Sequence, residues 1–404
     1  MTLHKLLLSF LLATGVSATA NAQWSPLTTG QTTGYIMDYI RYNSDIYACG
    51  SITKIGGTSV NSVAKWNGTQ WQPVGNTFTE WVHKLEPIGT DLFAMPYNTT
   101  ADSNHIYKWD GSQWNKYAKG FYLTNTNLGS YHASSLYDAI EYNGKLIVCG
   151  EFDRAGSNNI SGIAEWNGSD WSALGTGLTD PITGLNIYPH KMFLYNSNLY
   201  VVGNFKKAGG VTVNGVAYWD GSNWHAMGDG FNSAVYGIEE YKGSLYACGE
   251  FTKSGSDDLY SIAKWDGAKW VNAGISLTTD VPGYKAFGHT LKKVGDLLYV
   301  SGGFDQCIDA NMQIVPGNNV LEYDGNSWYA MDGGTDGDLE GIIDYGNGQV
   351  LFGGGYTKAG NITVNSMSLW HSTVNVLTLI SNNKISLYPC DFTIIAYRLE
   401  KFFF

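Results

Sequence analysis

The feature of this sequence that most constrains its fold is a segment that recurs seven times along the chain. Successive copies lie 43 to 58 residues apart, and residues 195–228 and 241–274 show the pattern most clearly. Four-stranded propeller blades repeat at about this length, so the spacing predicts seven blades. The aromatic residues that mark the copies are Trp66, Trp109, Trp166, Trp219, Trp265, Tyr323 and Trp370.

Each repeat divides into short segments with the residue preferences of β-strands. In the fifth repeat the predicted strands cover residues 236–241, 245–251, 261–265 and 269–273. The Asp266-Gly267 pair between the last two predicts a hairpin with a type I′ turn, in which both central residues have positive φ. The 50 glycines and the low charged fraction of 15% agree with many short strands joined by tight turns.

A second tryptophan follows the turn in six repeats and is missing from the seventh. Near the N-terminus, Trp24 opens the stretch 24–30, which matches residues 171–177. The sequence therefore predicts an all-β fold, a seven-bladed β-propeller closed by an N-terminal strand that completes the last blade. We expect the tryptophan pairs to pack between blades, with a carbohydrate-stacking surface as the alternative. The six second tryptophans are Trp71, Trp114, Trp171, Trp224, Trp270 and Trp328.

The first 22 residues have the pattern of a secretory signal peptide. Lys5 precedes a short apolar run at residues 6–13, and Ala20-Asn21-Ala22 matches a small-x-small cleavage site. The run is too short to span a bilayer, which takes about 20 residues.

The net charge of −11 argues against a nucleic-acid partner, because an acidic surface repels phosphate.

Three of the five cysteines, Cys49, Cys149 and Cys248, occupy one position of the repeat in blades that are not neighbours. A disulfide needs Cα atoms within about 7 Å of each other. We therefore expect buried free thiols at these positions.

Standard catalytic motifs are missing: the chain has no Gly-x-Ser-x-Gly, no phosphate-binding glycine loop with lysine and no His-Glu-x-x-His. Aligning the first strands on their turns gives one candidate site, because three of the eight histidines share a single position. The innermost strands of a propeller surround its channel, so the residues at this position would form a ring at the channel mouth. They are Met37, His83, Tyr137, His190, Tyr236, His289 and Glu340.

This ring is predicted to bind a ligand through the last six of these residues. A metal held by its histidines and tyrosines, or polar filler in a wet channel, are the alternatives. We assign no metal and no cofactor. A second set follows the glycine of strand two, where solvation of a strand end competes with a role in a groove. It comprises Ser51, Glu151, Asn204 and Glu250.

The glycine-rich end of strand two, followed by Trp-Asp-Gly-x-x-Trp, resembles the kelch-type propeller repeat. It is still more similar to repeats of secreted Bacteroidetes proteins, which carry Phe-Thr-x-Ala-Gly-Gly and Asn-x-Ile-Ala-x-Trp-Asp-Gly. The matching stretches here begin at Phe205, Phe251 and Tyr356, and the resemblance covers about residues 24–373. It implies the propeller architecture and says nothing about chemistry.

Residues 383–389, Asn-Lys-Ile-Ser-Leu-Tyr-Pro, resemble the start of a type IX secretion sorting domain. Only fifteen residues follow Pro389, so the resemblance implies a truncated domain. We therefore divide the chain into a signal peptide (1–22), a propeller (23–376) and a linker with a sorting-signal remnant (377–404). This implies a secreted or surface location, or a periplasmic one if the sorting signal is truncated.

The leading hypothesis is a monomeric, non-enzymatic secreted or surface binding protein whose partner is a protein or a carbohydrate. The alternative is a secreted enzyme, either a polysaccharide hydrolase or lyase, or a metal-dependent oxidase that uses the ring. A purely structural cell-surface module is the third reading.

Overall fold

The computed structural model describes residues 23–75, 78, 80–97, 104–124, 134–180 and 187–372. All regular structure in these residues is β, and they contain no helix. Accordingly, no described segment forms a helix that could cross a membrane. The predicted signal peptide and the sorting-signal remnant lie outside the described residues, as do the last four residues of the predicted propeller.

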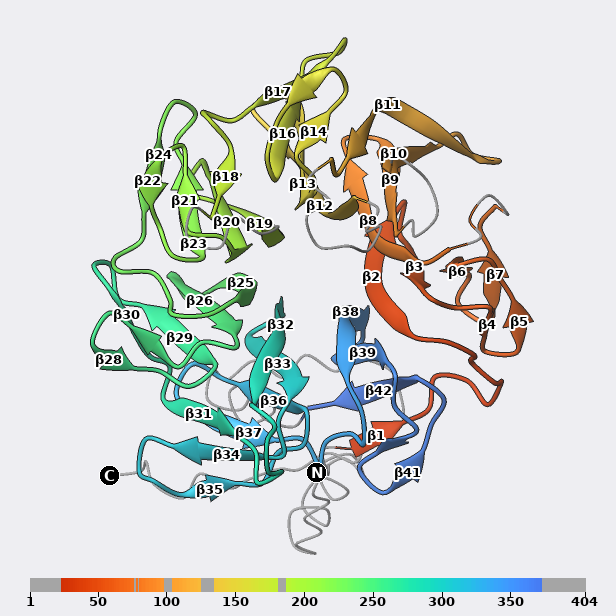
Figure 1. The fold of residues 1–404 in the computed structure, drawn as a ribbon. Helices are drawn as coiled ribbons and strands as arrows, with labels where there is room; N and C mark the ends of the chain where they lie inside the picture. Colours follow the sequence, from red (N-terminus) through yellow and green to blue (C-terminus); the bar gives the residue numbers. More distant parts are fainter. Residues whose placement is uncertain are drawn as a thin grey trace, which may run out of the picture.

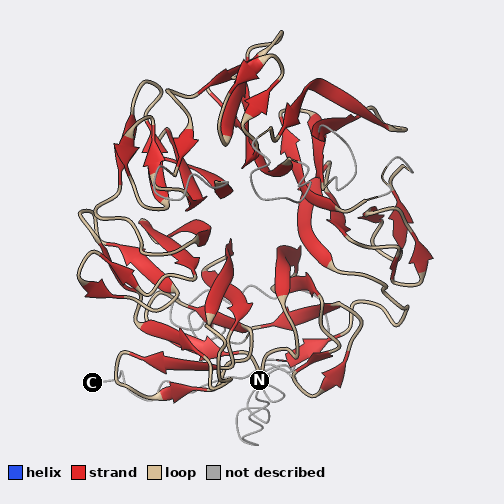
Figure 2. Ribbon diagram, in the orientation of Figure 1, coloured by secondary structure: helices blue, strands red, loops and turns tan. Residues whose placement is uncertain are grey.

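Six four-stranded antiparallel sheets and one six-stranded sheet make up most of the described chain, and we call them the radial sheets. Figures 1 and 2 show them arranged around a central opening. The first radial sheet is β2 (Ile36–Tyr42), β3 (Asp45–Gly50), β6 (Val63–Trp66) and β7 (Trp71–Pro73). The second is β8 (Val82–Ile88), β9 (Asp91–Pro96), β10 (Asn104–Trp109) and β11 (Trp114–Tyr122), extended by β14 (Arg154–Ala155) and β15 (Asn158–Asn159).

The remaining radial sheets repeat this order. The third is β12 (Ser135–Tyr142), β13 (Lys145–Glu151), β16 (Ile163–Trp166) and β17 (Trp171–Ala173); the fourth is β19 (Tyr188–Tyr195), β20 (Asn198–Asn204), β23 (Val216–Trp219) and β24 (Trp224–Ala226). The fifth is β25 (Val235–Tyr241), β26 (Ser244–Gly249), β29 (Ile262–Trp265) and β30 (Trp270–Asn272); the sixth is β32 (Phe287–Val294), β33 (Leu297–Gly303), β36 (Val320–Tyr323) and β37 (Trp328–Ala330). The last is β38 (Leu339–Gly346), β39 (Gln349–Gly354), β42 (Met367–His371) and β1 (Gln23–Ser25).

Short insert strands form the remaining small sheets, most of them between the second and third strands of a radial sheet. They are β4 (Lys54–Ile55) with β5 (Thr58–Ser59); β18 (Leu178–Thr179) with β21 (Lys207–Ala208) and β22 (Val211–Thr212); β27 (Lys253–Ser254) with β28 (Asp257–Asp258); β31 (Ile275–Thr278) with β34 (Gln306–Asp309) and β35 (Ile314–Val315); and β40 (Lys358–Ala359) with β41 (Ile362–Thr363).

The first strand of each radial sheet lies nearest the central opening (Figure 1). Each of these strands contacts the first strand of the next sheet, from β2 and β8 through to β32 and β38, and β38 contacts β2. The hydrophobic core is correspondingly divided into clusters between sheets. One such cluster joins Phe93 and Met95 of β9 to Val148 of β13.

The second tryptophan of the first six repeats is buried and packs between sheets. Trp171 lies 5.1 Å from Trp166 of its own sheet, measured between ring centroids, and its Nε1 donates to the Lys119 carbonyl of the preceding sheet at 2.8 Å. Trp114, Trp224 and Trp328 make the same kind of bond to the preceding sheet. Burial leaves their faces unavailable to a sugar, so the carbohydrate-stacking alternative is wrong for these residues.

Trp24 is likewise buried and packs between sheets, as part of the last radial sheet. β1 pairs antiparallel with β42, which places Trp24 opposite Trp370. The two rings are 4.9 Å apart, and Trp24 Nε1 donates to the Met331 carbonyl of the preceding sheet at 2.8 Å. The first and last described strands of the chain therefore share one sheet.

The structure corrects one prediction about the turns. Asp266-Gly267 does lie in a hairpin, between β29 and β30, but only Gly267 has a positive φ. The loop contains four residues, and the Asp266 carboxylate accepts hydrogen bonds from the N–H groups of Ala268 and Lys269. A local side-chain to backbone bond therefore replaces the predicted type I′ turn.

The prediction about the cysteines is confirmed. Cys49, Cys149 and Cys248 are buried and free, and so is Cys307. Cys390 lies outside the described residues.

Candidate functional site

Each radial sheet has a β-bulge at one position of its first strand. In β25, for example, Val235 pairs with Gly249 and Gly237 pairs with Cys248, so Tyr236 has no partner. Bulges re-aim a side chain, and here all seven lie at the predicted ring position. The unpaired residues are Met37, His83, Tyr137, His190, Tyr236, His289 and Glu340.

The glycine that ends strand two faces this bulge. A Cβ on Gly249 would lie 2.2 Å from the Ala234 carbonyl oxygen, well inside van der Waals contact. The same close approach occurs in five other sheets, and Pro96 takes the position in the second sheet. The other glycines are Gly50, Gly150, Gly203, Gly302 and Gly354.

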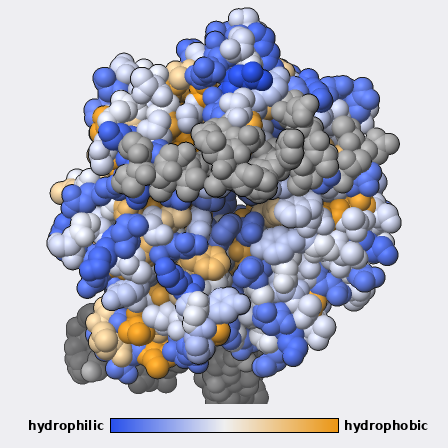
Figure 3. Space-filling view, in the orientation of Figure 1, coloured by the Kyte–Doolittle hydropathy of each residue, from blue (hydrophilic) through white to orange (hydrophobic). Residues whose placement is uncertain are grey.

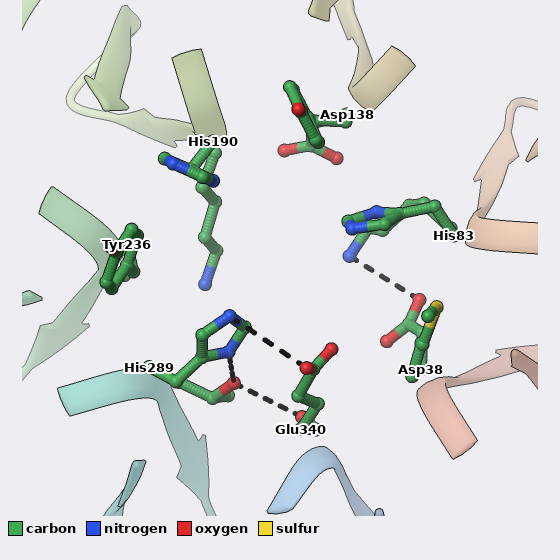
Figure 4. A pocket seen from close by; sticks show the side chains of 13 residues that line it. Asp38, His83, Asp138, His190, Tyr236, His289 and Glu340 are labelled. Carbon is green, nitrogen blue, oxygen red and sulfur yellow. Dashed lines mark hydrogen bonds and ion pairs between the residues drawn. The ribbon is translucent and has the colours of Figure 1, made fainter. Parts of the chain in front are cut away.

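All seven bulge residues line one cavity of about 100 Å³ on the central axis. Figure 4 shows the labelled side chains, each from a different strand, surrounding a common space. The structure therefore brings together every residue of the predicted ring. Whether the ring binds a ligand stays a prediction. On the face shown in Figure 3, the visible side chains near the axis are mostly hydrophilic.

Five of the ring residues form a continuous aromatic arc. Neighbouring rings from His83 through Tyr137, His190 and Tyr236 to His289 have centroids 4.7 to 5.5 Å apart. The planes alternate between tilted and edge-on, so the arc offers ring edges as well as faces to the cavity.

Burial controls the protonation of the first four residues of the arc. It lowers the pKa of His83 to about 4 and that of His190 to about 3, and His289 contributes to both shifts. Burial also raises the pKa of Tyr137 and of Tyr236. At neutral pH these side chains are uncharged, so they can donate and accept hydrogen bonds without adding charge to the cavity.

Glu340 lies beside the end of the arc. Its Oε1 is 4.0 Å from His289 Nε2, and its carboxyl group is hydrogen-bonded to Tyr35. Burial raises the pKa of this carboxyl group. Thr290 Oγ1 lies 3.4 Å from His289 Nδ1 and donates to the Glu340 carbonyl at 3.3 Å. Both contacts of the imidazole are longer than well-formed hydrogen bonds of about 2.7 to 3.2 Å.

In six of the seven radial sheets the residue after the bulge also lines the cavity, as a second layer that the sequence analysis missed. Asp38, Lys84, Asp138 and Lys191 supply its charges, and they follow the ring residues in the first four sheets. The signal was present as the alternation Asp, Lys, Asp, Lys at one repeat position. Lys84 Nζ lies 3.5 Å from Asp38 Oδ2, which is one of the interactions drawn in Figure 4.

Two members of the second predicted set support neighbours of the cavity, and whether the set lines a groove stays a prediction. The Glu250 carboxylate accepts a hydrogen bond from Tyr236 at 2.5 Å. Ser51 Oγ accepts one from the Tyr35 backbone N–H at 3.2 Å. Glu151 is buried and Asn204 is exposed. Glu250 therefore orients a ring residue.

The described residues contain no cluster of three or more of the usual metal ligands. No three His, Cys, Asp or Glu side chains among them come close enough together to hold an ion. The three ring histidines alternate with tyrosines around the arc, which keeps their nitrogens apart.

Comparison with known proteins identifies the architecture. No family model matches this sequence, and no curated protein matches it. A chain in a crystal structure of the mitotic checkpoint complex is similar in fold, with 11% identity, a TM-score of 0.50, and coverage of 88% of this chain and 94% of that one. YCF48 from Cyanidioschyzon merolae is 12% identical with a TM-score of 0.48, over 88% of this chain and 100% of that one. The likeness to the checkpoint-complex chain and the sheet topology together show that the fold of this chain is an all-β propeller scaffold.

Proposed function

We propose that this chain is a secreted or surface-associated, non-enzymatic binding protein that holds a protein or glycan partner at the mouth of a propeller channel. The observation that carries the proposal is the set of seven bulges, which turn seven side chains into one axial cavity. A bulge at the same place in every sheet directs one side chain per sheet toward a common ligand space, whereas loops of different lengths place their side chains less regularly.

The proposed scaffold is a seven-bladed ring closed by the N-terminal strand. The contact between β38 and β2 supports this, as does the pairing of β1 with β42. The kelch-like repeat signature supports the same architecture. Secretion rests on the signal-peptide pattern at 1–22 and on the similarity of 383–389 to a type IX sorting domain. We propose a monomer, because propeller blades satisfy their own sheet edges.

The contacts in the cavity favour binding over catalysis. The hydroxyl of Thr290 is directed to a backbone carbonyl, and its distance of 3.4 Å from His289 is long for activation by a base. Neutral imidazoles, phenols and an ammonium group are recognition groups for polar ligands. Nothing in the contacts favours the hydrolase, lyase or oxidase alternatives.

A binding panel of soluble glycans and peptides tests the proposal. Parent protein is compared with a His190→Ala, His289→Ala double variant and with His225→Ala, a histidine on an outer hairpin bonded to Asp220. We expect a ligand that binds the parent and the His225→Ala variant, loses at least about tenfold in affinity for the double variant, and is recovered chemically unchanged.

Two results would overturn the proposal. A ligand recovered cleaved or oxidised would make the protein an enzyme. Binding that is equal in the parent and the double variant would move the site away from the ring.

A further inference from the structure

Lys84 and Lys191 occupy the same position in the second and fourth radial sheets, and each follows a sheet that carries an aspartate at that position. Asp38 of β2 precedes Lys84, and Asp138 of β12 precedes Lys191. The two pairs have different contacts. Asp38 forms an ion pair with Lys84, at 3.5 Å.

The carboxylate of Asp138 accepts hydrogen bonds from backbone N–H groups. Its Oδ2 accepts the Met192 backbone N–H at 2.8 Å, and its Oδ1 accepts the Ala139 N–H at 3.1 Å. Lys191 lines the cavity but forms no ion pair with any residue in the described part of the chain. Among the described residues, Lys191 therefore lacks the ion-pair partner that Lys84 has in Asp38.

The surroundings of Lys191 disfavour its positive charge. Burial lowers its pKa. Attraction from Glu239 and Asp138 raises the pKa, and repulsion from Lys292 and Lys84 offsets part of that attraction. Lys84 differs from Lys191. Burial also lowers the pKa of Lys84, but attraction from Asp38 and Asp138 holds that pKa above its usual value. A partly buried, unpaired charge costs stability until an opposite charge arrives.

We propose that the cavity binds a compact carboxylate ligand, with the Lys191 ammonium group as its counter-ion and the aromatic arc beside its organic part. This inference rests on the proposed binding function and names the chemistry of the ligand. A single negative charge matches a single free ammonium group. The carboxylates of Asp38, Asp138 and Glu340 line the same cavity, and their repulsion is twice as large for a dianion such as phosphate as for a monoanion.

The aromatic arc completes the site. His83 and His190 flank Tyr137, and the ring centroids of His190 and Tyr236 are only 4.7 Å apart. An imidazole N–H can donate to the second carboxylate oxygen, since uncharged histidine keeps one N–H. The cavity of about 100 Å³ admits a small acid or the carboxyl end of a larger one.

The test is calorimetric titration of the full chain with acetate and glucuronate, each against its neutral counterpart, acetamide and glucose. We expect both acids, or glucuronate alone, to bind at least about tenfold more tightly than the neutral probes, because hydrogen bonds to charged groups contribute more than neutral ones. Acetate binding would identify a simple acid as sufficient. Binding of glucuronate alone would identify a sugar acid.

Three variants assign the effect to one residue. Lys191→Met should lose at least about tenfold in acid affinity, and Lys191→Arg should keep it. The matched control is Lys253→Met, which removes a lysine paired with Asp258 on an insert hairpin. Without any probe, Lys191→Met should melt at the same temperature as the parent or higher, because it removes an unpaired charge.

The inference is wrong if the acids bind no better than the neutral probes, if Lys191→Met binds acetate and glucuronate as the parent does, or if it lowers the melting temperature. If a neutral glycan or peptide binds, and its binding still depends on His190 and His289, the proposed binding function stands and only the inference of a carboxylate ligand is wrong. Loss of all ring-dependent binding would remove both.

Discussion

The glycine that ends strand two shows how one residue type fixes the position of another. At Gly249 the bulge brings the Ala234 carbonyl so close that any side chain would separate β25 from β26. The backbone angle is not the reason, because Gly249 has no positive φ. The glycine is needed for space.

A Gly249→Ala substitution should therefore cost about 3 kcal/mol or more in the free energy of unfolding, as overpacking against backbone does. Gly267→Ala is the control, since Gly267 has a φ of 105° but open space around its Cα. It should cost about 1 to 2 kcal/mol. Urea denaturation of both variants measures the difference. Equal losses would mean that the close approach at the bulge relaxes without penalty.

The thiols give a second prediction for single residues. Burial raises the pKa of Cys248 to about 12 and that of Cys49 and Cys149 well above the usual range. In a Cys390→Ser variant, the native protein should show no rapid reaction with Ellman's reagent, and unfolding in urea should release four thiols. A thiol that reacts within minutes in the native protein would contradict the burial.

Alignment of the repeats placed the seven ring residues at one repeat position, and the structure places all seven around one cavity, because a bulge at a constant position preserves their spacing from the turn. It did not reveal the bulges themselves, since an extra residue in a strand leaves no mark in the hydrophobic pattern. Nor did it show that Asp138 binds backbone while Asp38 binds a lysine. That choice depends on side-chain direction between two sheets, which sequence spacing does not specify.

At the scale of elements, β1 performs in three residues the task that β7, β17 and β24 perform in the other sheets. Trp24 packs on Trp370 and bonds to the Met331 carbonyl, as Trp224 packs on Trp219 and bonds to the Leu174 carbonyl. The match between residues 24–30 and 171–177 predicted this element. The prediction of a type I′ turn at Asp266-Gly267 was wrong, because the Asp side chain competes with that turn for backbone N–H groups.

Trp24→Ala should therefore destabilise the protein as much as Trp224→Ala, by about 3 to 5 kcal/mol, the usual cost of truncating a buried tryptophan. Trp224 is the matched control because its sheet is built from consecutive strands. Thermal and urea unfolding of both variants measure the losses. A Trp24→Ala loss below about 1 kcal/mol would show that the last sheet is stable without β1, contradicting ring closure by this strand.

For the whole molecule, the axial cavity makes stability depend on pH. Histidines with lowered pKa values bind fewer protons in the folded state than in the unfolded state between the two pKa values. Stability is thus full above about pH 6.5 and falls as the pH drops toward about 4 for His83 and about 3 for His190.

A His83→Asn, His190→Asn variant should show a flatter dependence of the urea midpoint on pH between 6.5 and 4 than the parent. Buried acids such as Glu340, whose pKa is raised, act in the opposite direction in both proteins, so the comparison isolates the histidines. The control is His225→Asn, on the outer hairpin. Parallel profiles for the parent and the double variant would contradict the assigned pKa values.

The pairing of β1 with β42 also has a mechanical consequence. Gln23 lies opposite His371 and Ser25 opposite Leu369, so the N-terminal end of β1 and the C-terminal end of β42 are at the same end of the ladder. A force that pulls residues 23 and 371 apart therefore opens the hydrogen bonds one after another, as in a zipper, instead of loading them together in shear. In an optical trap this three-residue ladder should open first, at low force, before the other six radial sheets extend.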